Sequence, residues 1–178
     1  MIIKIVVAFI IAVAILAGMI TLQSETYTVS RSIVVAAPAS VVFAQINDFH
    51  NWAKWSPWEK LDPSMTRSYE GATAGTGAVY RWSGNSKAGE GIMRITESRP
   101  GDRIAVQLAF SRPYASSSDV TFTLHPDGKN SGVTWSMVGK NNFALKAVSF
   151  FSSMDRLLGP DFERGLADLK IVAEDAQK

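Results

Sequence analysis

The feature that most limits the possible folds is a series of short strand-like segments in the middle of the chain. Each segment is rich in β-branched, aromatic or alternating apolar residues and ends near Gly, Pro or Asn. The segments cover residues 66–70, 77–82, 90–97, 103–110, 115–124 and 133–139. Because turn residues separate them, the pattern predicts an antiparallel meander and not an alternation of strands and helices.

Two further elements precede this series. Residues 26–36 alternate apolar and polar side chains and predict a long first strand, although Arg31 interrupts the apolar phase. Residues 37–46 place apolar side chains on one face at helical spacing and predict a short helix.

The end of the chain has helical periodicity. Apolar residues recur at helical spacing over 143–158, and the Gly159–Pro160 pair that follows predicts an interruption. Asp161 is placed to cap a second helical stretch. An antiparallel sheet needs a cover for its apolar face, and this C-terminal helix is the element long enough to supply it. We therefore expect an α+β fold in which the sheet wraps around the C-terminal helix and a hollow remains between them.

An apolar segment at the N-terminus bears on location. Ile5–Leu22 is apolar with two exceptions, and its length of about eighteen residues is near the minimum for a membrane-spanning helix. Lys4 precedes the segment, so the positive-inside rule predicts a cytoplasmic N-terminus and a domain outside the cytoplasm, on the periplasmic side. We favour an uncleaved single-pass signal anchor that contacts the membrane through residues 4–22. A cleaved signal peptide and a buried core helix are the alternatives.

The composition is that of a folded domain. The 178 residues are 47% hydrophobic and 19% charged, which suits one domain with a buried core. We expect a membrane segment at 1–24 and a single domain at 25–178. The net charge of +2 is spread along the chain without a dense basic block, so no nucleic-acid partner is expected. The lack of cysteine excludes disulfides, thiolate metal sites and a Cys nucleophile.

The sequence shows no pattern for a metal, a cofactor or a phosphate group. His50 and His125 have no partner at a motif spacing, so we interpret both as surface histidines and expect no metal. The glycine-rich stretch 71–77 precedes a strand and lacks the Lys and the following helix of a phosphate loop. No cofactor is expected.

A tryptophan-rich segment at residues 46–58 stands between the short helix and the strand series. It carries Trp52, Trp55 and Trp58, and Pro57 favours an extended residue before it, so a helix through the first two should end before the third. We expect the segment to cover one end of the apolar hollow, because loop aromatics often serve binding. The alternative is structural packing of the segment on the edge of the sheet.

Three carboxylates are candidates for acid–base chemistry inside such a hollow: Glu90, Asp119 and Asp155. Glu90 shares one face of its strand with Arg94, and that face is either solvated or turned inward. Asp155 lies among apolar residues of the last helix and is either an exposed helix acid or a pocket acid with a raised pKa. We favour the exposed alternative for both.

Apolar side chains are the stronger candidates for ligand contact, because pockets for small molecules are formed mainly by aromatic and aliphatic groups. Plain core packing is the alternative role for each. The candidates are Trp55, Trp58, Tyr80, Trp82, Met93, Trp135, Met137, Phe151, Met154 and Phe162.

Several short runs, taken in order, also resemble a known superfamily. They are Arg31–Pro38 with Val42 and Phe43, Ile46–Phe49 with Trp52, Trp55, Ser56 and Pro57, Gly75–Tyr80, Gly91–Glu97, Val133–Met137, Asn141–Phe143, and Asp161–Leu166 with Leu169. In this order they resemble the START-like, helix-grip superfamily, and above all its bacterial polyketide cyclase/dehydrase-type branch, the SRPBCC proteins. The resemblance implies a deep pocket for a hydrophobic small molecule or lipid between the sheet and the last helix, and it implies no particular reaction.

Three functions are consistent with this sequence. The first is a membrane-tethered binding protein for a hydrophobic small molecule or lipid, because an anchor would hold the pocket beside the membrane. The second is a cyclase/dehydratase-type enzyme that uses a carboxylate in the cavity. The third is an envelope sensor or interaction module. We expect the first, and binding more than catalysis.

Overall fold

The computed structural model describes residues 1–177, except for the side chains of Ser149 and Phe151. The helices are α1 (Ile2–Thr21), α2 (Ala39–Asn47), α3 (Trp52–Trp55), α4 (Phe143–Phe151) and α5 (Met154–Asp175), with 3-10 turns η1 (Phe49–Asn51) and η2 (Pro57–Lys60). The strands are β1 (Thr26–Val35), β2 (Thr66–Gly71), β3 (Ala78–Ser83), β4 (Glu90–Arg99), β5 (Arg103–Arg112), β6 (Ser116–Asp127) and β7 (Asn130–Lys140). The predicted strand series and the predicted first strand are confirmed.

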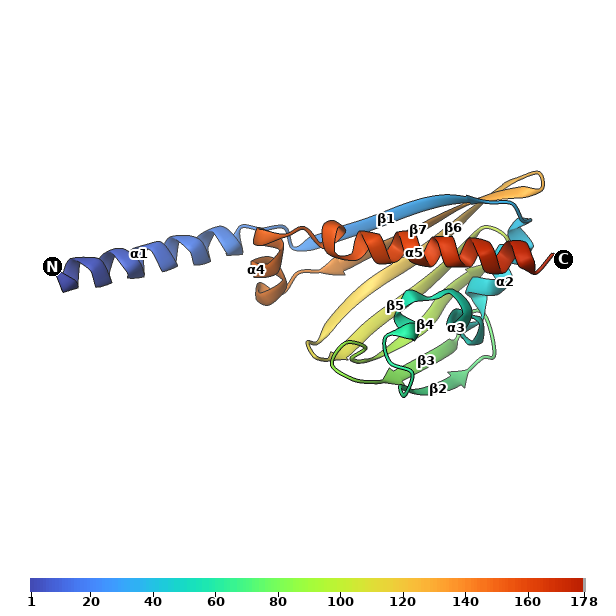
Figure 1. The fold of residues 1–178 in the computed structure, drawn as a ribbon, viewed down its shortest axis with the longest axis horizontal. Helices are drawn as coiled ribbons and strands as arrows, with labels where there is room; N and C mark the ends of the chain where they lie inside the picture. The colour runs from blue at the N-terminus through green and yellow to red at the C-terminus, as the bar shows by residue number, and fades with distance from the viewer. Residues whose placement is uncertain (178) are drawn as a thin grey trace.

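The strands described in residues 1–177 form one seven-stranded antiparallel sheet in the order β1-β7-β6-β5-β4-β3-β2 (Figure 1). Strands β2 to β7 follow one another as the predicted meander, and β1 pairs with β7 from Thr26 opposite Lys140 to Val35 opposite Ser131. Because neighbouring strands run in opposite directions, the start of β1, the end of β7 and the end of β5 lie at the same end of the strands. This end of the sheet faces the C-terminal end of α1 (Figure 1), and we call it the α1 edge.

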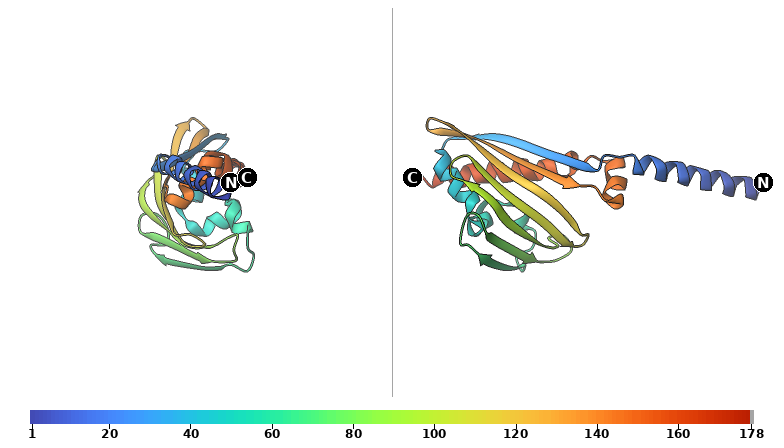
Figure 2. Two further views of the ribbon diagram at one scale, coloured as in Figure 1. Left: turned by 90° about the vertical axis from the view of Figure 1, so that its left-hand side faces the viewer. Right: turned by 180° about the vertical axis from the view of Figure 1, so that it is seen from behind.

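The sheet curves, and the helices α2, α3 and α5 lie on its concave side (Figure 2). On β7, for example, Val133, Trp135 and Met137 are buried while the side chains between them are more exposed. This alternation of apolar inner residues and more polar outer residues is expected for a sheet with one covered face. The α+β helix-grip fold expected from the sequence is confirmed.

The C-terminal helices differ from the prediction. The break expected at Gly159–Pro160 lies instead at Ser152 and Ser153, and α5 continues through Pro160. Ser152 is extended, with φ −152° and ψ 127°. The Ser153 side chain then caps α5 by accepting a hydrogen bond from the backbone N–H of Arg156 at 3.2 Å. The cap satisfies one of the free N–H groups of the first turn and so fixes where the helix begins.

Arg31 explains how α5 tolerates the Gly-Pro pair. The guanidinium of Arg31 projects from the concave side of β1 and donates hydrogen bonds to Asp155 and Glu163 of α5, both at 2.7 Å. A Cβ atom on Gly159 would collide with this guanidinium, so the glycine allows the helix to pack directly against β1. These contacts offset the backbone hydrogen bond that Pro160 cannot donate.

An aromatic cluster fills the centre of the interior. The indole of Trp135 stacks on Phe162 of α5, with ring centroids 4.3 Å apart, and on Phe122 of β6 at 4.9 Å. A Cβ atom on Gly165 would lie 2.8 Å from the Trp135 ring and 3.0 Å from Pro57. The backbone of α5 therefore lies directly on the Trp135 ring, and at Gly165 the helix and the sheet are in close contact without space for another side-chain atom.

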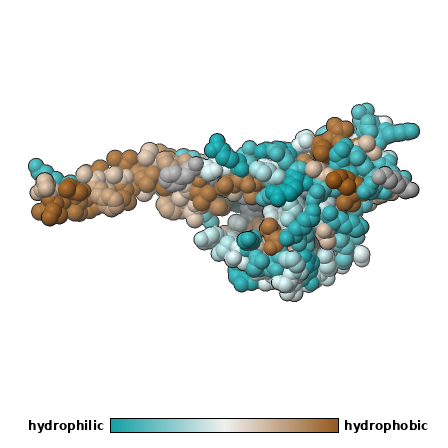
Figure 3. All heavy atoms as spheres, viewed as in Figure 1, coloured by the Kyte–Doolittle hydropathy of each residue, from teal (hydrophilic) through white to brown (hydrophobic). Residues whose placement is uncertain are grey.

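Helix α1 extends away from the domain (Figure 1). It is long and apolar enough to cross a membrane, and its most apolar stretch is not buried inside the described protein. Figure 3 shows apolar side chains gathered along α1, while polar side chains dominate the visible surface of the domain. A membrane span and a signal sequence both have these properties, whereas the buried core helix considered above does not fit this exposure.

Replacing Gly165 with Ala should lower the free energy of unfolding by about 1–3 kcal/mol, because the new methyl group overpacks the contact with Trp135. The loss should exceed the roughly 1 kcal/mol that alanine contributes through helix propensity. Denaturant unfolding of the full chain in detergent, followed by tryptophan fluorescence, measures this change. Ala167→Val, at an exposed position of the same helix, is the control and should shift stability by no more than about 0.5 kcal/mol. A Gly165→Ala protein as stable as the wild type would contradict the tight contact.

Candidate functional site

The tryptophan segment forms part of the core. Trp55 is 0% exposed and Trp52 is 3% exposed. Their indole N–H groups donate to the backbone carbonyls of Gln45 (3.1 Å) and Ile46 (2.9 Å), at the end of α2. The segment folds back on the helix before it, so its first two rings point inward and satisfy their donors locally. The expectation of a lid at these two positions is corrected, and ligand contact by Trp55 stays a prediction.

Trp58 differs from its two neighbours because it is half-buried. Helix α3 ends at Trp55 and Ser56 is extended, as predicted from Pro57. The chain therefore changes direction before Trp58, which lies in η2. Its ring meets Trp135 edge-on at 5.5 Å and Phe162 at 6.0 Å. Trp58 therefore lies at the boundary of the aromatic cluster, with one side in the core and one side open.

Burial on the concave face falls toward the α1 edge. On β5, Ile104 and Val106 are 0% and 1% exposed, whereas the next two inward side chains, Leu108 and Phe110, are only half-buried. On β4, Ile95 is 0% exposed and Met93 is half-buried. Apolar side chains thus continue on the inner face of each strand beyond the residues that are closely packed.

Helix α5 shows the same gradient. Leu166 and Phe162 are each 1% exposed, whereas Leu158 and Met154, one and two turns nearer its start, are half-buried. Leu158 and Met154 thus join the half-buried apolar residues of β4, β5 and η2 that pack against the core. We call the set the half-buried patch, and its members are Trp58, Met93, Leu108, Phe110, Met154 and Leu158.

A few polar groups adjoin this patch. Ser118 of β6 is the register partner of Leu108, and its hydroxyl lies 3.3 Å from the hydroxyl of Tyr27. Beside Trp58, the buried indole N–H of Trp135 has no hydrogen-bond partner among the described residues. A buried donor without an acceptor costs free energy, so this N–H is available to an oxygen atom that enters the site.

A network around Glu59 is a feature that the sequence did not suggest. The Tyr80 hydroxyl donates to one oxygen of the Glu59 carboxylate at 2.5 Å, and Arg67 donates to the other at 2.8 Å. The side chain of Glu59 is 9% exposed. These bonds join η2 to β2 and β3 and hold the turn that carries Trp58. Glu59 comes directly after that tryptophan, but the strand partners become apparent only in the folded sheet.

The three carboxylate candidates lie outside the interior. Asp119 is exposed on the outer face of β6, and Glu90 lies on the outer face of β4. Arg112 donates to Glu90 at 2.9 Å and keeps the pKa of this carboxyl below its usual value. Asp155 is exposed, and its hydrogen bond from Arg31 lowers its pKa. The alternative of a pocket acid with a raised pKa is therefore corrected for Asp155.

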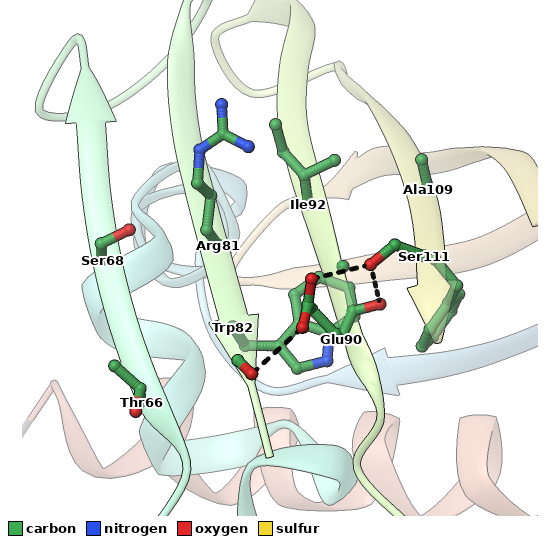
Figure 4. Close-up of a pocket in the computed structure, with 11 residues that line it drawn as sticks. Thr66, Ser68, Arg81, Trp82, Glu90, Ile92, Ala109 and Ser111 are labelled. Carbon is green, nitrogen blue, oxygen red and sulfur yellow. Dashed lines mark hydrogen bonds between the residues drawn. The ribbon is translucent and has the colours of Figure 1, made fainter. Parts of the chain in front are cut away.

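Two surface depressions are found among the described residues, and the larger one includes Phe110 of the half-buried patch in its lining. The larger, of about 530 Å³, lies on the outer face of β2 to β5, around Arg81, Glu90 and Ile92 (Figure 4). The smaller, of about 290 Å³, lies at the β2 edge, where the rings of His50 and Tyr69 stack at 3.9 Å. The larger depression combines polar side chains of the outer face with Trp82 and Phe110, and no residue of α5 lines either depression, so neither is the expected apolar pocket between the sheet and the last helix.

The predicted ligand-binding residues therefore separate into groups by position. Trp58, Met93 and Met154 belong to the half-buried patch, and Tyr80, Trp82 and Met137 are buried on the same concave face. Trp55, Trp135 and Phe162 form the aromatic cluster, and the Phe151 side chain lies outside the described part of the structure. The prediction missed Leu108, Phe110 and Leu158, although the alternation of Ile104, Val106, Leu108 and Phe110 in the sequence already placed the first two on the inner face.

A curved antiparallel sheet that grips a long C-terminal helix defines a helix-grip protein of the α+β class. Residues 26–174 match the family described as polyketide cyclase / dehydrase and lipid transport. The chain therefore belongs to this family, which confirms the resemblance found in the sequence. No curated protein matches the chain significantly.

Solved structures with low sequence identity share the fold. The Zhui aromatase/cyclase from Streptomyces sp. R1128 has a TM-score of 0.65 and 14% identity, over 86% of this chain and 96% of that one. Protein CV1439 from Chromobacterium violaceum has a TM-score of 0.60 and 18% identity, over 83% and 98%. The protein Ara h 8.0201 has a TM-score of 0.55 and 11% identity, over 85% and 97%.

Replacing Tyr80 with Phe should lower the free energy of unfolding at neutral pH by about 1–3 kcal/mol, because Glu59 loses a donor. Burial and the hydrogen bond to Glu59 raise the pKa of Tyr80 well above its usual value of 10. The neutral phenol therefore stabilises the folded state, and this contribution is lost as the pH rises above 10.

The stability difference between the wild type and Tyr80→Phe should consequently shrink in the alkaline range. Urea unfolding at a series of pH values measures it, with Tyr114→Phe as the control because Tyr114 is 73% exposed. A difference for Tyr80 that stays constant through the alkaline range would contradict the assigned network.

Proposed function

We propose that the protein is a membrane-tethered binding protein for an apolar small molecule or lipid, with residues 1–24 as the anchor and residues 25–178 as the binding domain. The observation that carries this proposal is the half-buried patch. The patch continues the inner face of the sheet and of α5 beyond the point where they pack closely. A ligand that covered it would remove apolar surface from water at a gain of about 25 cal/mol per Å².

The chemistry of the patch suits such a ligand. Small-molecule sites are mainly apolar, with a few polar groups that orient the ligand. Here the indole N–H of Trp135 is an unpartnered donor, and the hydroxyls of Tyr27 and Ser118 adjoin the patch. These groups would donate hydrogen bonds to a carbonyl or hydroxyl oxygen on an otherwise apolar molecule.

We propose binding and not cyclisation or dehydration. Glu90, Asp119 and Asp155, the acids considered for that chemistry, lie outside the interior. Glu59 is close to the patch, but both of its oxygens accept hydrogen bonds from Tyr80 and Arg67. The family description includes lipid transport besides cyclase and dehydrase activity, and it is consistent with a binding role.

The position of α1 supports the tether. Helix α1 leads directly into β1, and the linker between Thr21 and Thr26 is short. If α1 spans a bilayer, the domain stays beside it, with the α1 edge of the sheet turned toward the lipid. The half-buried patch lies at this edge, where apolar ligands dissolved in the membrane are nearest.

Native mass spectrometry and lipid extraction of the full-length protein, purified in detergent, test the proposal. The wild type should retain an apolar molecule, and Leu108→Asn should retain less than about one tenth as much, since a polar group in the patch costs on the order of 1.4 kcal/mol or more. Gln107→Ala is the matched control, because Gln107 neighbours Leu108 but points to the outer face. A wild type with no retained or titratable apolar ligand, or equal retention by both variants, would overturn it.

A further inference from the structure

Helix α4 exposes apolar side chains although it is part of the domain. Its sequence from Phe143 to Phe151 contains one charged residue, Lys146. Phe143 is 58% exposed and Val148 is 45% exposed, and Leu157 in the next helix is 48% exposed. In a domain whose surface is otherwise mostly polar, such a group of exposed apolar residues marks an interaction surface.

Hydrogen bonds fix α4 to the end of α1. The ammonium group of Lys146 donates to the backbone carbonyl of Thr21, the last residue of α1, at 3.2 Å. Just before α4, the Asn141 side chain donates to the carbonyl of Ser24 at 2.9 Å, and its backbone N–H donates to the carbonyl of Glu25 at 2.8 Å. The depth of α4 relative to a membrane is therefore set by the depth at which α1 ends.

The level at which α1 ends is that of the lipid headgroups. Under the proposed tether, the apolar stretch of α1 occupies the hydrocarbon region, and the polar residues that follow Leu22 leave it. Helix α4, bonded to Thr21, then lies beside the boundary between hydrocarbon and headgroups. At that depth the lipid itself can cover the exposed apolar side chains of α4, and no second protein is needed.

The charges around α4 fit the same partner. Lys140 and Arg156 are exposed at the two ends of the segment that contains α4, and Lys146 lies within it. The nearby carboxylate of Asp155 is paired with Arg31, and Glu25 is the exposed acid beside the linker. Three cations against one unpaired acid give this surface a positive balance, which favours anionic lipid headgroups.

We propose that α4 and the first turn of α5 lie in the interface of the bilayer that α1 crosses, with Phe143, Val148 and Leu157 inserted at the level of the headgroups. The inference rests on the proposed membrane tether. Its consequence is that the half-buried patch opens toward the lipid and not toward water, because Met154 and Leu158 belong both to α5 and to the patch. An apolar ligand would then pass between membrane and domain without crossing the aqueous phase.

Fluorescence quenching by spin-labelled lipid tests the inference on the full-length chain. The protein has no cysteine, so single cysteines introduced as Val148→Cys, Ile10→Cys and Ile171→Cys can each be labelled with bimane. Ile10 and Ile171 are both 59% exposed, the first in α1 and the second near the far end of α5. Each labelled protein is reconstituted in vesicles of phosphatidylethanolamine and phosphatidylglycerol, without spin label or with a phosphatidylcholine that carries a doxyl group either near its headgroup or near the end of its acyl chain. Circular dichroism checks that every variant is folded.

The proposal predicts that the lipid labelled near its headgroup quenches most of the bimane fluorescence at position 148, that the lipid labelled near the end of its acyl chain quenches position 10, and that neither lipid changes position 171. Quenching at position 10 without quenching at position 148 would overturn the interfacial role of α4 and leave the tether standing. Absence of quenching at position 10 would refute the tether, and the inference with it. Equal quenching at positions 148 and 171 would show that the domain lies on the lipid without orientation, which also contradicts the proposal.

Discussion

The contact between Trp135 and helix α5 is the constraint on which the rest of the structure depends. The indole stacks on Phe162 at 4.3 Å, and the backbone of α5 at Gly165 rests on the same ring. Trp55 and Phe122 surround this contact and close the interior around it. The sheet is twisted and curved, whereas α5 is a helix with its own axis, so the two surfaces diverge with distance from this contact. The packing on its two sides is therefore free to differ.

The packing is in fact unequal, and the proposed binding site rests on this difference. On the side of the C-terminus, where α5 packs on α2 and α3, Leu166 and Leu169 are fully buried. On the side of α1, the same faces continue with Leu108, Phe110 and Leu158, which remain half-buried. Apolar side chains that a fold aligns but does not cover are a site for an apolar partner. Under the proposed tether, helix α1 would place that site beside the lipid.

Sequence reasoning predicted the fold well and the site only in part. Strands were predictable because alternation has period two and turn residues mark the ends. The break before α5 was placed wrongly because Arg31, more than a hundred residues away, accommodates the Gly159–Pro160 pair. Trp55 looked like a loop aromatic because no local pattern shows that its N–H turns back to Gln45. Burial that changes along one strand, as between Val106 and Leu108, depends on how two curved surfaces diverge and leaves no trace in hydropathy.

The central claim is that the apolar site lies between the sheet and the start of α5. Photo-crosslinking with a fatty acid that carries a diazirine, followed by peptide mass spectrometry of the full-length protein in phospholipid vesicles, tests it most directly. The account predicts adducts in β5 near Leu108 and Phe110 and in α5 near Met154 and Leu158. Adducts confined to β2, β3 and the outer face of β4, around Arg81 and Ile92, would contradict it.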